Sequence, residues 1–598
     1  MPRYTAPVKD ALFIINEVLD LQSHVEDLPS YAEATPDLIA AILEESGKFV
    51  SNELAPLNLS GDEEGCTLLE DGTVKTPKGF KEAYQAYSEA GWPSLTQDPE
   101  FGGQGMPHAV GMIIEEFLVS ANHGFAMYPG LSSGAMAAIN IDGSQEQKEQ
   151  YLPKMVEGSW TGTMNLTEPH CGTDLGMLRT KAEPNADGSY NITGTKIFIS
   201  SGDHDMSENI IHLVLARMPD SPAGTKGISL FIVPKFHIND DGSIGERNGV
   251  SVGSLEEKMG IHANSTCVMN YDQATGYLIG EKNKGLNSMF IMMNAARIGV
   301  GIQGLALSEV SYQNALDYAK DRLQMRSLTG PKNPEGPADP IIVHPDVRRM
   351  LMNSKSFNEA SRCLAVWCGH LVEMSHNSTN EKRREWADDI VGLLTPIIKG
   401  VMTDEGFDNC VNNQQVFGGH GYVKEWGMEQ FVRDARIAQI YEGTNGIQAL
   451  DLVGRKLGAN GGRSIQRYFK SVQTLIAENK ENDALKDFTV PLEAGIKDLQ
   501  QATMWLMQNG MANPDNAGAG SVAYMHLFGR VILGHMWLWM ASVVQPKIEA
   551  SEGDTAFYKT KIKTGRYFMR RRMVETKSLL AELEAGCEDV MALHEDEF

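Results

Sequence analysis

One carboxylate, Glu442, lies in a sequence context that suits a general base. Apolar and aromatic residues precede it, and Gly443 and Thr444 follow it directly. A carboxylate in an apolar cleft is poorly solvated, so its pKa rises toward neutrality, where a general base works best. A glycine beside it lets the backbone approach a ligand without a Cβ in the way. Residues 431–448 therefore predict a catalytic carboxylate, although a glutamate before Gly-Thr is by itself more often an ordinary loop residue.

A second candidate site is the turn in residues 164–174, Met-Asn-Leu-Thr-Glu-Pro-His-Cys-Gly-Thr-Asp. A strand ends there in hydroxyls, a glycine and an exposed turn. Thr167 and Thr173, together with nearby backbone N–H groups, can bind a polar heterocycle or a pyrophosphate. A plain transition from strand to turn explains the same residues equally well.

A third candidate site lies in residues 196–202, Lys-Ile-Phe-Ile-Ser-Ser-Gly. Phe198 and Ser200 are two residues apart, which places them on the same face of a strand. One stacking contact and one hydrogen bond suit a flat ring system. An ordinary half-buried strand has the same pattern.

A fourth candidate site is the glycine cluster in residues 415–422, Gln-Val-Phe-Gly-Gly-His-Gly-Tyr. Its glycines permit close approach of the backbone to a ligand. The pattern is not the Gly-x-Gly-x-x-Gly of a dinucleotide-binding turn, and no alternation of strands and helices surrounds it. We therefore exclude a nicotinamide dinucleotide site on a doubly wound sheet.

Composition limits the partners and the compartment. The 598-residue chain has 78 acidic and 52 basic residues, a net charge of −26, which argues against nucleic acid and anionic membranes as partners. Its seven cysteines are scattered and form no Cys-x-x-Cys pair, so neither a disulfide framework nor a metal site is expected. The first twenty residues lack the pattern of a secretory signal. A cytoplasmic protein without membrane insertion is predicted.

The periodicity of apolar residues divides the chain into segments of different character. Residues 1–35 form an N-terminal extension and residues 36–160 have a helical period. Short apolar runs between turn residues predict a β domain in residues 161–285. Helical periods return in residues 286–457 and, after a glycine-rich break, in residues 463–598. Two shorter features lie within these segments: the proline-spaced residues 331–340 predict a loop, and the apolar residues 525–544 predict a buried helix.

The order and spacing of these motifs resemble the acyl-CoA dehydrogenase family. The resemblance rests on the Thr-Glu-Pro…Gly-Thr-Asp turn, the Gln-Val-Phe-Gly-Gly-x-Gly-Tyr run, Arg-Asp-Ala-Arg-Ile and Tyr-Glu-Gly-Thr. It covers roughly residues 36–455. The extensions at both ends are similar to those of a ~600-residue bacterial branch of the family. The resemblance implies an α+β multidomain fold: an N-terminal helical domain, a middle β-barrel-like domain, a C-terminal helical bundle and an extra C-terminal helical domain.

The resemblance also assigns roles to residues. Glu442 matches the catalytic base, and Ala296 stands where some members carry a rival carboxylate. Arg297, Tyr441 and Gly443 are implied at the substrate. The residues implied to bind FAD are Thr167, Gly172, Thr173, Phe198 and Ser200 in the β region, and Arg322, Gln415, Gly418, Gly419 and Thr444 in the helical region.

Some positions depart from the family pattern. Phe198 stands where a tryptophan is usual, which keeps a stacking face but loses area and the indole N–H. Cys171 and Met177 stand where small residues are usual. Gln430 replaces a basic residue, and Gly446 replaces a glutamine-type flavin contact, with Gln448 nearby. None of these changes removes the chemistry.

The implied reaction is FAD-dependent α,β-dehydrogenation of an acyl-CoA to a trans-2-enoyl-CoA, with an electron-transfer flavoprotein as the electron acceptor. The favoured substrate is 3-methylmercaptopropionyl-CoA, an intermediate of dimethylsulfoniopropionate degradation, or another short- or medium-chain acyl-CoA. Alternatives are a medium- or long-chain dehydrogenase of β-oxidation, a flavin-dependent acyl-CoA oxidase and a non-catalytic acyl-CoA-binding scaffold. A homodimer or a dimer of dimers is expected, because the family completes its flavin sites across a subunit interface.

Overall fold

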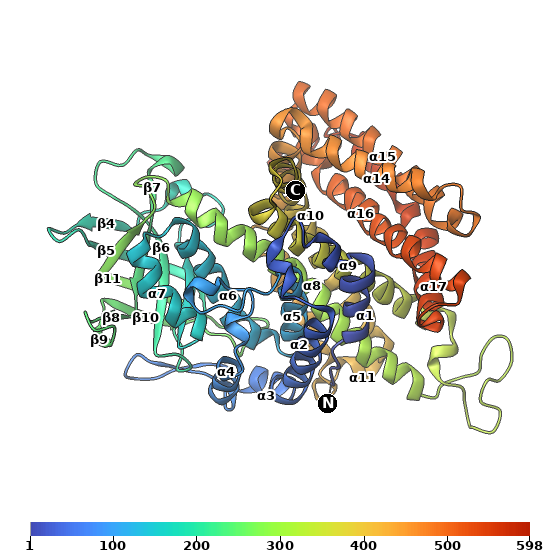
Figure 1. The fold of residues 1–598 in the computed structure, drawn as a ribbon, viewed down its shortest axis with the longest axis horizontal. Coiled ribbons are helices and arrows are strands. Elements are labelled where there is room, and N and C mark those ends of the chain that lie inside the picture. Colours follow the sequence, from blue (N-terminus) through green and yellow to red (C-terminus); the bar gives the residue numbers. More distant parts are fainter. Residues whose placement is uncertain (1) are drawn as a thin grey trace. The chain divides into compact units, whose positions relative to one another are not determined.

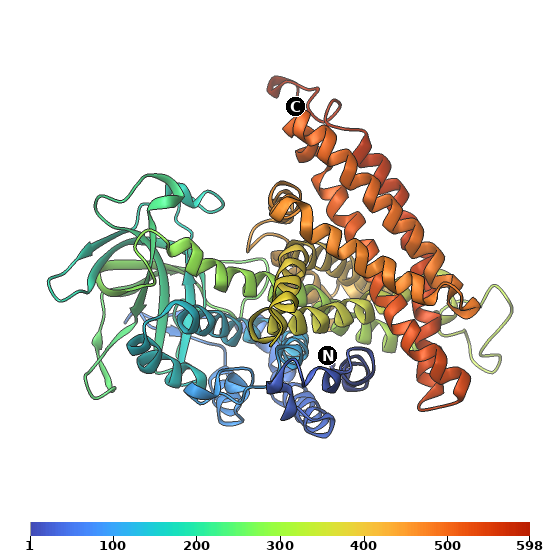
Figure 2. The ribbon, with the colours of Figure 1, turned by 45° about the horizontal axis from the view of Figure 1, so that its top comes forward.

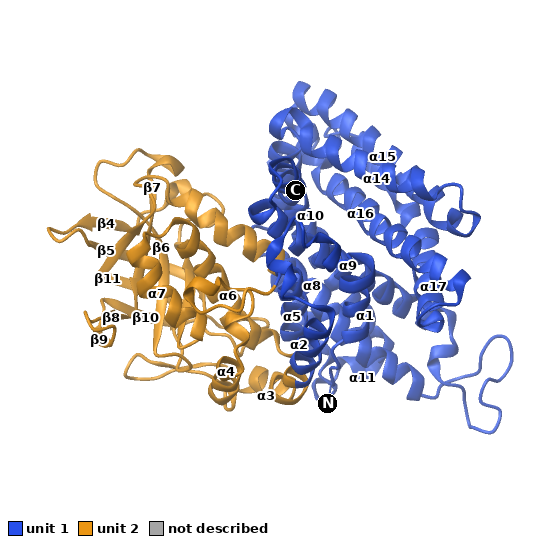
Figure 3. Ribbon diagram, viewed as in Figure 1, with its two compact units in different colours: residues 1–48, 107–120, 300–598 blue, residues 49–106, 121–299 orange. Residues whose placement is uncertain are grey.

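The computed structural model describes residues 2–598, and the chain divides into two compact units (Figures 1 and 3). The first unit combines the chain up to Lys48 with Pro107–Ser120 and Val300–Phe598. The second unit combines Phe49–Met106 and Ala121–Gly299.

The second unit contains a seven-stranded sheet that closes on itself. The strands β11, β5, β4, β6 and β7 form a ring, because β7 pairs with both β6 and β11, and β10 and β3 flank this ring. The β-barrel-like domain predicted from the sequence is thereby confirmed. Its strands are β3 (Trp160–Asn165), β4 (Lys181–Pro184), β5 (Tyr190–Ser200), β6 (Asn209–Arg217), β7 (Ile228–Pro234), β10 (Val250–Leu255) and β11 (Thr266–Ile279), and the short strands β8 (Phe236–Ile238) and β9 (Ile244–Arg247) pair separately.

Strand β6 is buried along almost its whole length because both of its faces are covered. Ile211, Leu213 and Leu215 pack in a cluster with residues of the neighbouring helices, whereas Val214 and Ala216 pack with residues of the other strands. This alternation follows from the two-residue period of a strand. The helices of this unit are α3 (Pro56–Glu64), α4 (Phe80–Glu89), α6 (His123–Asp142), α7 (Gln145–Glu157) and the first part of α8 (Gly285–Asp321), and β1 (Thr67–Leu68) and β2 (Val74–Lys75) form a small hairpin.

The first unit is helical. Two long antiparallel neighbours, α9 and α10, form its centre (Figure 1). The helices before the C-terminal segment are α1 (Val8–Phe13), α2 (Pro36–Phe49), α5 (His108–Ala121), the second part of α8, α9 (Pro345–Asn377), α10 (Glu381–Val416), α11 (Gly419–Tyr422), α12 (Met428–Arg436) and α13 (Asn445–Asp451).

The last helices of this unit surround α16, the helix that contains the apolar residues 525–544 (Figure 2). Helices α8 and α16 are both long and apolar enough to cross a membrane, but 83% of the apolar window of α16 is buried inside the protein. The buried helix predicted for residues 525–544 is therefore confirmed. The set comprises α14 (Arg463–Asn479), α15 (Lys486–Ala512), α16 (Pro514–Ala550), α17 (Thr555–Arg571) and α18 (Thr576–Glu584).

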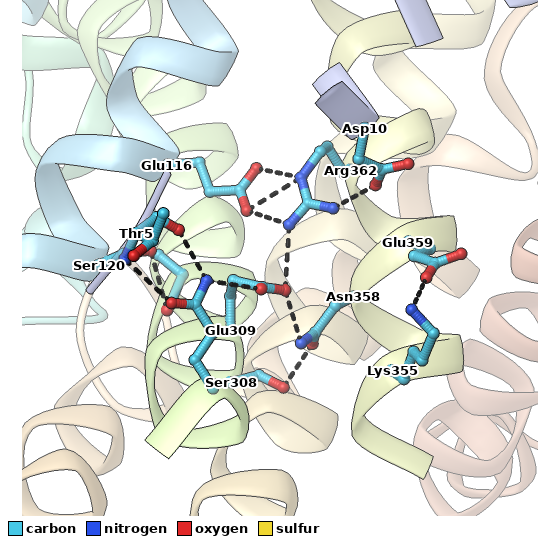
Figure 4. A network of polar contacts seen from close by, with 12 residues as sticks. Thr5, Asp10, Glu116, Ser120, Ser308, Glu309, Lys355, Asn358, Glu359 and Arg362 are labelled. Carbon is cyan, nitrogen blue, oxygen red and sulfur yellow. Dashed lines mark hydrogen bonds and ion pairs between the residues drawn. The ribbon is translucent and has the colours of Figure 1, made fainter. Parts of the chain in front are cut away.

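A buried ion-pair network joins distant segments of the first unit (Figure 4). The Arg362 guanidinium on α9 pairs with Glu116 of α5 at 2.6 Å and with Glu309 of α8 at 3.1 Å. It also pairs with Asp10 of α1, which in turn pairs with Lys561 of α17. Burial raises the pKa of Glu116 to about 7, against the lowering effect of Arg362. The N-terminal extension is thus fixed to the central helices by charge pairs in a site with little water.

The proline-spaced residues 331–340 form a loop without helix, as predicted. The loop is organised by the buried carboxylate of Asp339, which accepts backbone N–H bonds from Ser327, Lys332 and Asn333 at 2.7–2.9 Å. Burial alone would raise the pKa of Asp339, but these bonds outweigh it and lower the pKa to about 2. Asp339 therefore serves as the internal anchor of the loop.

Candidate active site

Glu442 lies in a tight loop between a 3-10 turn, Ile437–Gln439, and helix α13. We call residues 440–444 the catalytic loop. Two consecutive residues in it have left-handed backbones, with φ of 56° at Glu442 and 81° at Gly443. Such a conformation costs a non-glycine residue about 1–2 kcal/mol and persists only where the surroundings enforce it. The loop ends at Thr444, whose side chain caps α13 by accepting the Ile447 N–H at 3.4 Å.

Two buried side chains enforce this backbone. The Gln448 amide nitrogen donates to the carbonyl oxygen of Glu442 at 2.9 Å and to that of Gly443 at 3.4 Å. The Lys399 ammonium, on α10, also donates to the Gly443 carbonyl, at 2.7 Å. Gln448 lies near Gly446, the position where the family usually has a glutamine that contacts the flavin. In this structure the Gln448 amide nitrogen donates to the backbone of the catalytic loop.

The residue before Glu442 brings two further polar side chains to the loop. The Tyr441 hydroxyl donates to the side-chain oxygen of Gln303 on α8. Burial raises the pKa of Tyr441, and the nearby carboxylates of Glu442 and Glu115 add to that rise. Burial also raises the pKa of Glu115, on α5, to about 7. Asp434 adds to the rise in the pKa of Tyr441 as well, so several carboxyl groups act on the residue beside the base.

In the second unit, a buried ion pair holds the turn that follows β3. Glu168 accepts hydrogen bonds from Lys196 of β5 at 2.9 Å and from the Thr180 hydroxyl at 2.6 Å. Burial lowers the pKa of Lys196 to about 8, against the raising effect of Glu168. Glu168, His170 and Cys171 come close enough together to hold a metal ion, but the Glu168 oxygens already accept these bonds. We therefore interpret the cluster as the anchor of the turn.

The same anchor brings two of the predicted flavin-binding segments side by side. The Ile197 N–H donates to the Thr167 carbonyl at 2.9 Å, which joins the turn after β3 to β5. Phe198 has a left-handed backbone, with φ of 59°, and its side chain is 59% exposed. The register between β5 and β11 shifts between Lys196 and Ile199, so Phe198 lies in a β-bulge and Ser200, opposite Thr266, lies beyond it. The strand is thus bulged before Ile199. The exposures of Phe198, Ile199 and Ser200 still alternate, as the two-residue period of a strand requires. Gly172 and Thr173 are exposed.

In the first unit, Arg322 and the glycine cluster lie on one exposed surface. Stacking of Tyr318 on Phe417, with ring centroids 4.2 Å apart, packs the end of α8 against the end of α10. The Tyr318 hydroxyl also bonds His420 Nδ1 at 2.9 Å. Space is open around Gly418, whose φ is 56°, and around its neighbour, so that a Cβ at either position would meet no atom within 4 Å. The predicted FAD-binding residues exposed here are Arg322, Gln415, Gly418 and Gly419.

Models of known protein families match most of the chain. Residues 39–159, 163–274 and 283–457 match the N-terminal, middle and C-terminal domains of acyl-CoA dehydrogenase. Residues 468–594 match a domain described as acetyl-CoA dehydrogenase C-terminal like. The chain belongs to the acyl-CoA dehydrogenase family. It is thus an FAD-dependent oxidoreductase that dehydrogenates acyl-CoA thioesters, as the resemblance of its motifs predicted.

Individual relatives cover this acyl-CoA dehydrogenase almost from end to end. The 3-methylmercaptopropionyl-CoA dehydrogenase of Ruegeria pomeroyi is 43% identical over 96% of both chains. The broad-specificity linear acyl-CoA dehydrogenase FadE5 of Mycobacterium tuberculosis is 33% identical over 100% of both chains. Among solved structures, an acyl-CoA dehydrogenase from Bacillus anthracis, complexed with FAD, has a TM-score of 0.74 at 21% identity and covers 92% of this chain and 89% of its own. At that identity it supports the fold alone.

The local geometry in each unit suits FAD. In the second unit, the bulge holds the Phe198 ring outward although the next residue, Ile199, is buried, which leaves an aromatic face available for stacking. In the first unit, the open left-handed backbone at Gly418 is the kind that approaches a phosphate closely. The predicted FAD-binding residues are therefore compatible with the cofactor in both units.

The structure also identifies residues near the catalytic loop that the motifs did not. Lys399, Gln303 and Glu115 each lie on a long helix, far from the loop in sequence. A signal was present for Glu115, because acidic residues 115 and 116 interrupt an otherwise apolar helix. A similar signal was present for Lys399, which is the one charged residue in the apolar run 393–402 of α10. Arg297, predicted at the substrate, lies on α8 in the part that belongs to the second unit.

Proposed function

We propose that Glu442 is the catalytic base of this acyl-CoA dehydrogenase and that the preferred substrate is 3-methylmercaptopropionyl-CoA. The observation that carries the role of Glu442 is its strained loop, because a left-handed glutamate held by Gln448 and Lys399 indicates a functional constraint on the backbone. The substrate is favoured by the identity of 43%, over almost the whole chain, to a 3-methylmercaptopropionyl-CoA dehydrogenase.

In the proposed mechanism, the Glu442 carboxylate removes the α-proton of the thioester. The backbone N–H of Glu442 donates to the thioester carbonyl oxygen, where negative charge develops, and such a donor contributes about 2.7–4 kcal/mol to catalysis. FAD, when bound, supplies the acceptor for the β-hydride. Tyr441 and Gly443 contact the substrate beside the base. Arg297 is the third residue that we assign to substrate binding. Exclusion of water by the thioester strengthens the hydrogen bonds that polarise it.

We assign the flavin contacts to both units. Thr167, Gly172, Thr173, Phe198 and Ser200 would hold the ring and its neighbouring atoms, and Thr444 would contact the flavin just after the base. Arg322, Gln415, Gly418 and Gly419 would bind the adenine and pyrophosphate end of an FAD held by a neighbouring subunit. Their exposure in the single chain supports a homodimer or a dimer of dimers. A monomer in solution that still binds FAD tightly would contradict this assignment, and light scattering of the holoenzyme measures it.

An electron-transfer flavoprotein is the proposed electron acceptor and the cytoplasm the proposed compartment. The seven cysteines, all of them free in the structure, support a reducing compartment such as the cytoplasm. An oxidase on the same scaffold would pass electrons to oxygen instead. Peroxide release measured against reduction of an electron-transfer flavoprotein separates the two, and rapid peroxide release would refute the dehydrogenase assignment.

Two anaerobic experiments test the proposal. With the wild-type holoenzyme, loss of flavin absorbance across a panel of acyl-CoAs should be fastest with 3-methylmercaptopropionyl-CoA and straight chains of similar length. One methylene discriminates by only about 1–3 kcal/mol, so a strong preference for long chains would overturn the substrate and favour a medium- or long-chain enzyme. Glu442→Gln should slow reduction by about 10²–10⁴-fold, and near wild-type reduction would overturn the base.

A further inference from the structure

A single carboxylate on α10, that of Asp404, holds both ends of the catalytic loop. One of its oxygens, Oδ1, accepts a hydrogen bond from Gln439 Nε2, before the loop, at 2.7 Å. The same oxygen accepts a bond from Asn445 Nδ2, after the loop, also at 2.7 Å. Because these two donors lie on either side of Glu442, the Asp404 carboxylate restrains both loop ends. Asn445 Nδ2 also lies 2.9 Å from Thr403 Oγ1 and 3.2 Å from the Gly400 carbonyl oxygen, both on α10, so the Asp404 bond is the shortest of its three contacts.

We call these bonds from Gln439 and Asn445 to Asp404 the Asp404 clamp. Further hydrogen bonds connect the clamp to Gly443, the residue beside Glu442. The side-chain oxygen of Asn445 accepts a bond from Lys399 Nζ at 2.7 Å, and that ammonium donates to the Gly443 carbonyl at 2.7 Å. Lys399 is completely buried. An uninterrupted chain of hydrogen bonds therefore runs from Asp404 through Asn445 and Lys399 to the left-handed part of the loop.

The second oxygen of Asp404 is held by a residue of the C-terminal helices. His526 Nε2, on α16, lies 3.0 Å from Asp404 Oδ2. Within residues 2–598, the structure gives this oxygen no other hydrogen-bond donor. Burial alone would raise the pKa of Asp404, but the bonds from His526 and Gln439 and the charge of His526 outweigh it and lower the pKa. The carboxylate is thus ionised and oriented from both sides.

The neighbouring charges form a separate anchor between the same helices. Glu405, next to Asp404 on α10, pairs with Arg530 of α16 and with Arg572 at 2.8 Å. Both arginines also pair with Glu575 at 2.7 Å. This anchor fastens the C-terminal helices to α10, and none of its pairs described in residues 2–598 involves the catalytic loop. The remaining carboxylate on this side of α10, Asp408, has a raised pKa because of burial and its neighbours Glu405 and Asp404.

We propose that His526 is a positioning residue for catalysis: it orients the Asp404 carboxylate, which clamps the loop that carries Glu442. The C-terminal helical domain would then contribute directly to the geometry of the base, beyond covering the central helices. This inference rests on the proposed role of Glu442. In other enzymes, a displacement of about 1 Å far from the chemistry costs about 100-fold in rate.

The test compares two substitutions of His526 in the FAD-loaded enzyme. His526→Leu keeps the apolar volume of the side chain and removes the donor, whereas His526→Gln retains an N–H donor for Asp404. We expect His526→Leu to lower the rate constant of flavin reduction about 10-fold or more with little change in substrate dissociation constant. His526→Gln should recover most of that loss. Hydrogen exchange of the amides in residues 437–448 should rise in His526→Leu and return toward wild type in His526→Gln.

Two matched variants control for packing of the domain. His535, on the same helix, is buried among aromatic rings and its Nδ1 has no hydrogen-bond partner within residues 2–598. His535→Leu and Glu575→Gln each perturb the C-terminal domain without touching the clamp. Both should alter thermal stability while the rate constant of flavin reduction and the exchange of residues 437–448 stay near wild type.

The outcomes separate this inference from the proposed function. If Glu442→Gln abolishes flavin reduction and His526→Leu reduces flavin at the wild-type rate, the base is supported and the role of His526 is refuted. An equal loss in His526→Leu and His535→Leu would also refute it, because domain packing would then explain the effect. If Glu442→Gln remains active, the proposed function itself fails, whatever His526→Leu does.

Discussion

Replacement of Gly443 by alanine tests whether the strained loop determines the rate. Gly443 has a φ of 81°, and a Cβ at this position would come within 2.7 Å of the Gln448 amide nitrogen. That amide donates to the carbonyl oxygens of Glu442 and Gly443. Gly443→Ala therefore imposes backbone strain and displaces the side chain that holds the Glu442 carbonyl.

The magnitude follows from these two effects. A Cβ in the left-handed region costs about 1–2 kcal/mol. Loss of two neutral hydrogen bonds costs about 0.5–1.5 kcal/mol each, and the weaker of the two, at 3.4 Å, contributes least. The total is about 2–4 kcal/mol. If all of it acts on the position of Glu442, flavin reduction slows by roughly 30- to 1000-fold, because 1.4 kcal/mol corresponds to a factor of 10.

The assay is single-turnover reduction of the bound flavin by 3-methylmercaptopropionyl-CoA under anaerobic conditions. Gly454→Ala is the matched control, because Gly454 lies just after α13 and a Cβ there meets no atom within 4 Å and needs no left-handed backbone. The control should reduce flavin at the wild-type rate. Equal rates for Gly443→Ala and wild type, or equal losses in both variants, would refute the link between loop strain and catalysis.

Three further outcomes are expected. Arg362→Met leaves the buried carboxylates of Glu116 and Glu309 without their cation and should cost about 3–5 kcal/mol of stability in urea unfolding. Arg349→Met, at an exposed pair, should cost less than about 1 kcal/mol. Burial raises the pKa of Glu115 from 4.5 to about 7. The stability that this raised pKa contributes is complete below pH 4.5 and is lost as the pH rises through 7. Over that range, the free energy of unfolding of the wild type should therefore fall relative to that of Glu115→Gln. Lys196→Met should weaken FAD affinity, measured by flavin fluorescence, because the Glu168 turn loses its buried cation.

The fold class was predictable because its signals are local and periodic. The apolar residues of β6 alternate between two buried faces, and the apolar run 525–544 has the length and composition of a core helix. The order of motifs around Glu442 and Thr167 identified the family without a structure. Each of these signals lies within a few residues of chain, where the spacing of side chains determines the local conformation.

The contacts that hold the catalytic loop were not predictable, because they join residues far apart in the sequence. Lys399 and Asp404 reach the loop from the middle of α10, and His526 reaches it from another helix. The bulge at Phe198 was missed for a related reason. A left-handed phenylalanine is unfavourable by local preference, so only its surroundings in the sheet account for it.

A base that must approach a substrate cannot be buried deeply, and Glu442 is accordingly only half-buried in a loop. A loop is normally less rigid than the helices that it connects. This enzyme restrains the loop with side chains of α10 and α13, and the Asp404 clamp adds a contact from α16. The rigidity of the catalytic loop therefore comes from buried polar side chains on neighbouring helices. Substitution of these side chains would loosen the loop, although they contact neither substrate nor flavin. Substitutions in the C-terminal helices should consequently affect the rate of flavin reduction only where they reach this clamp.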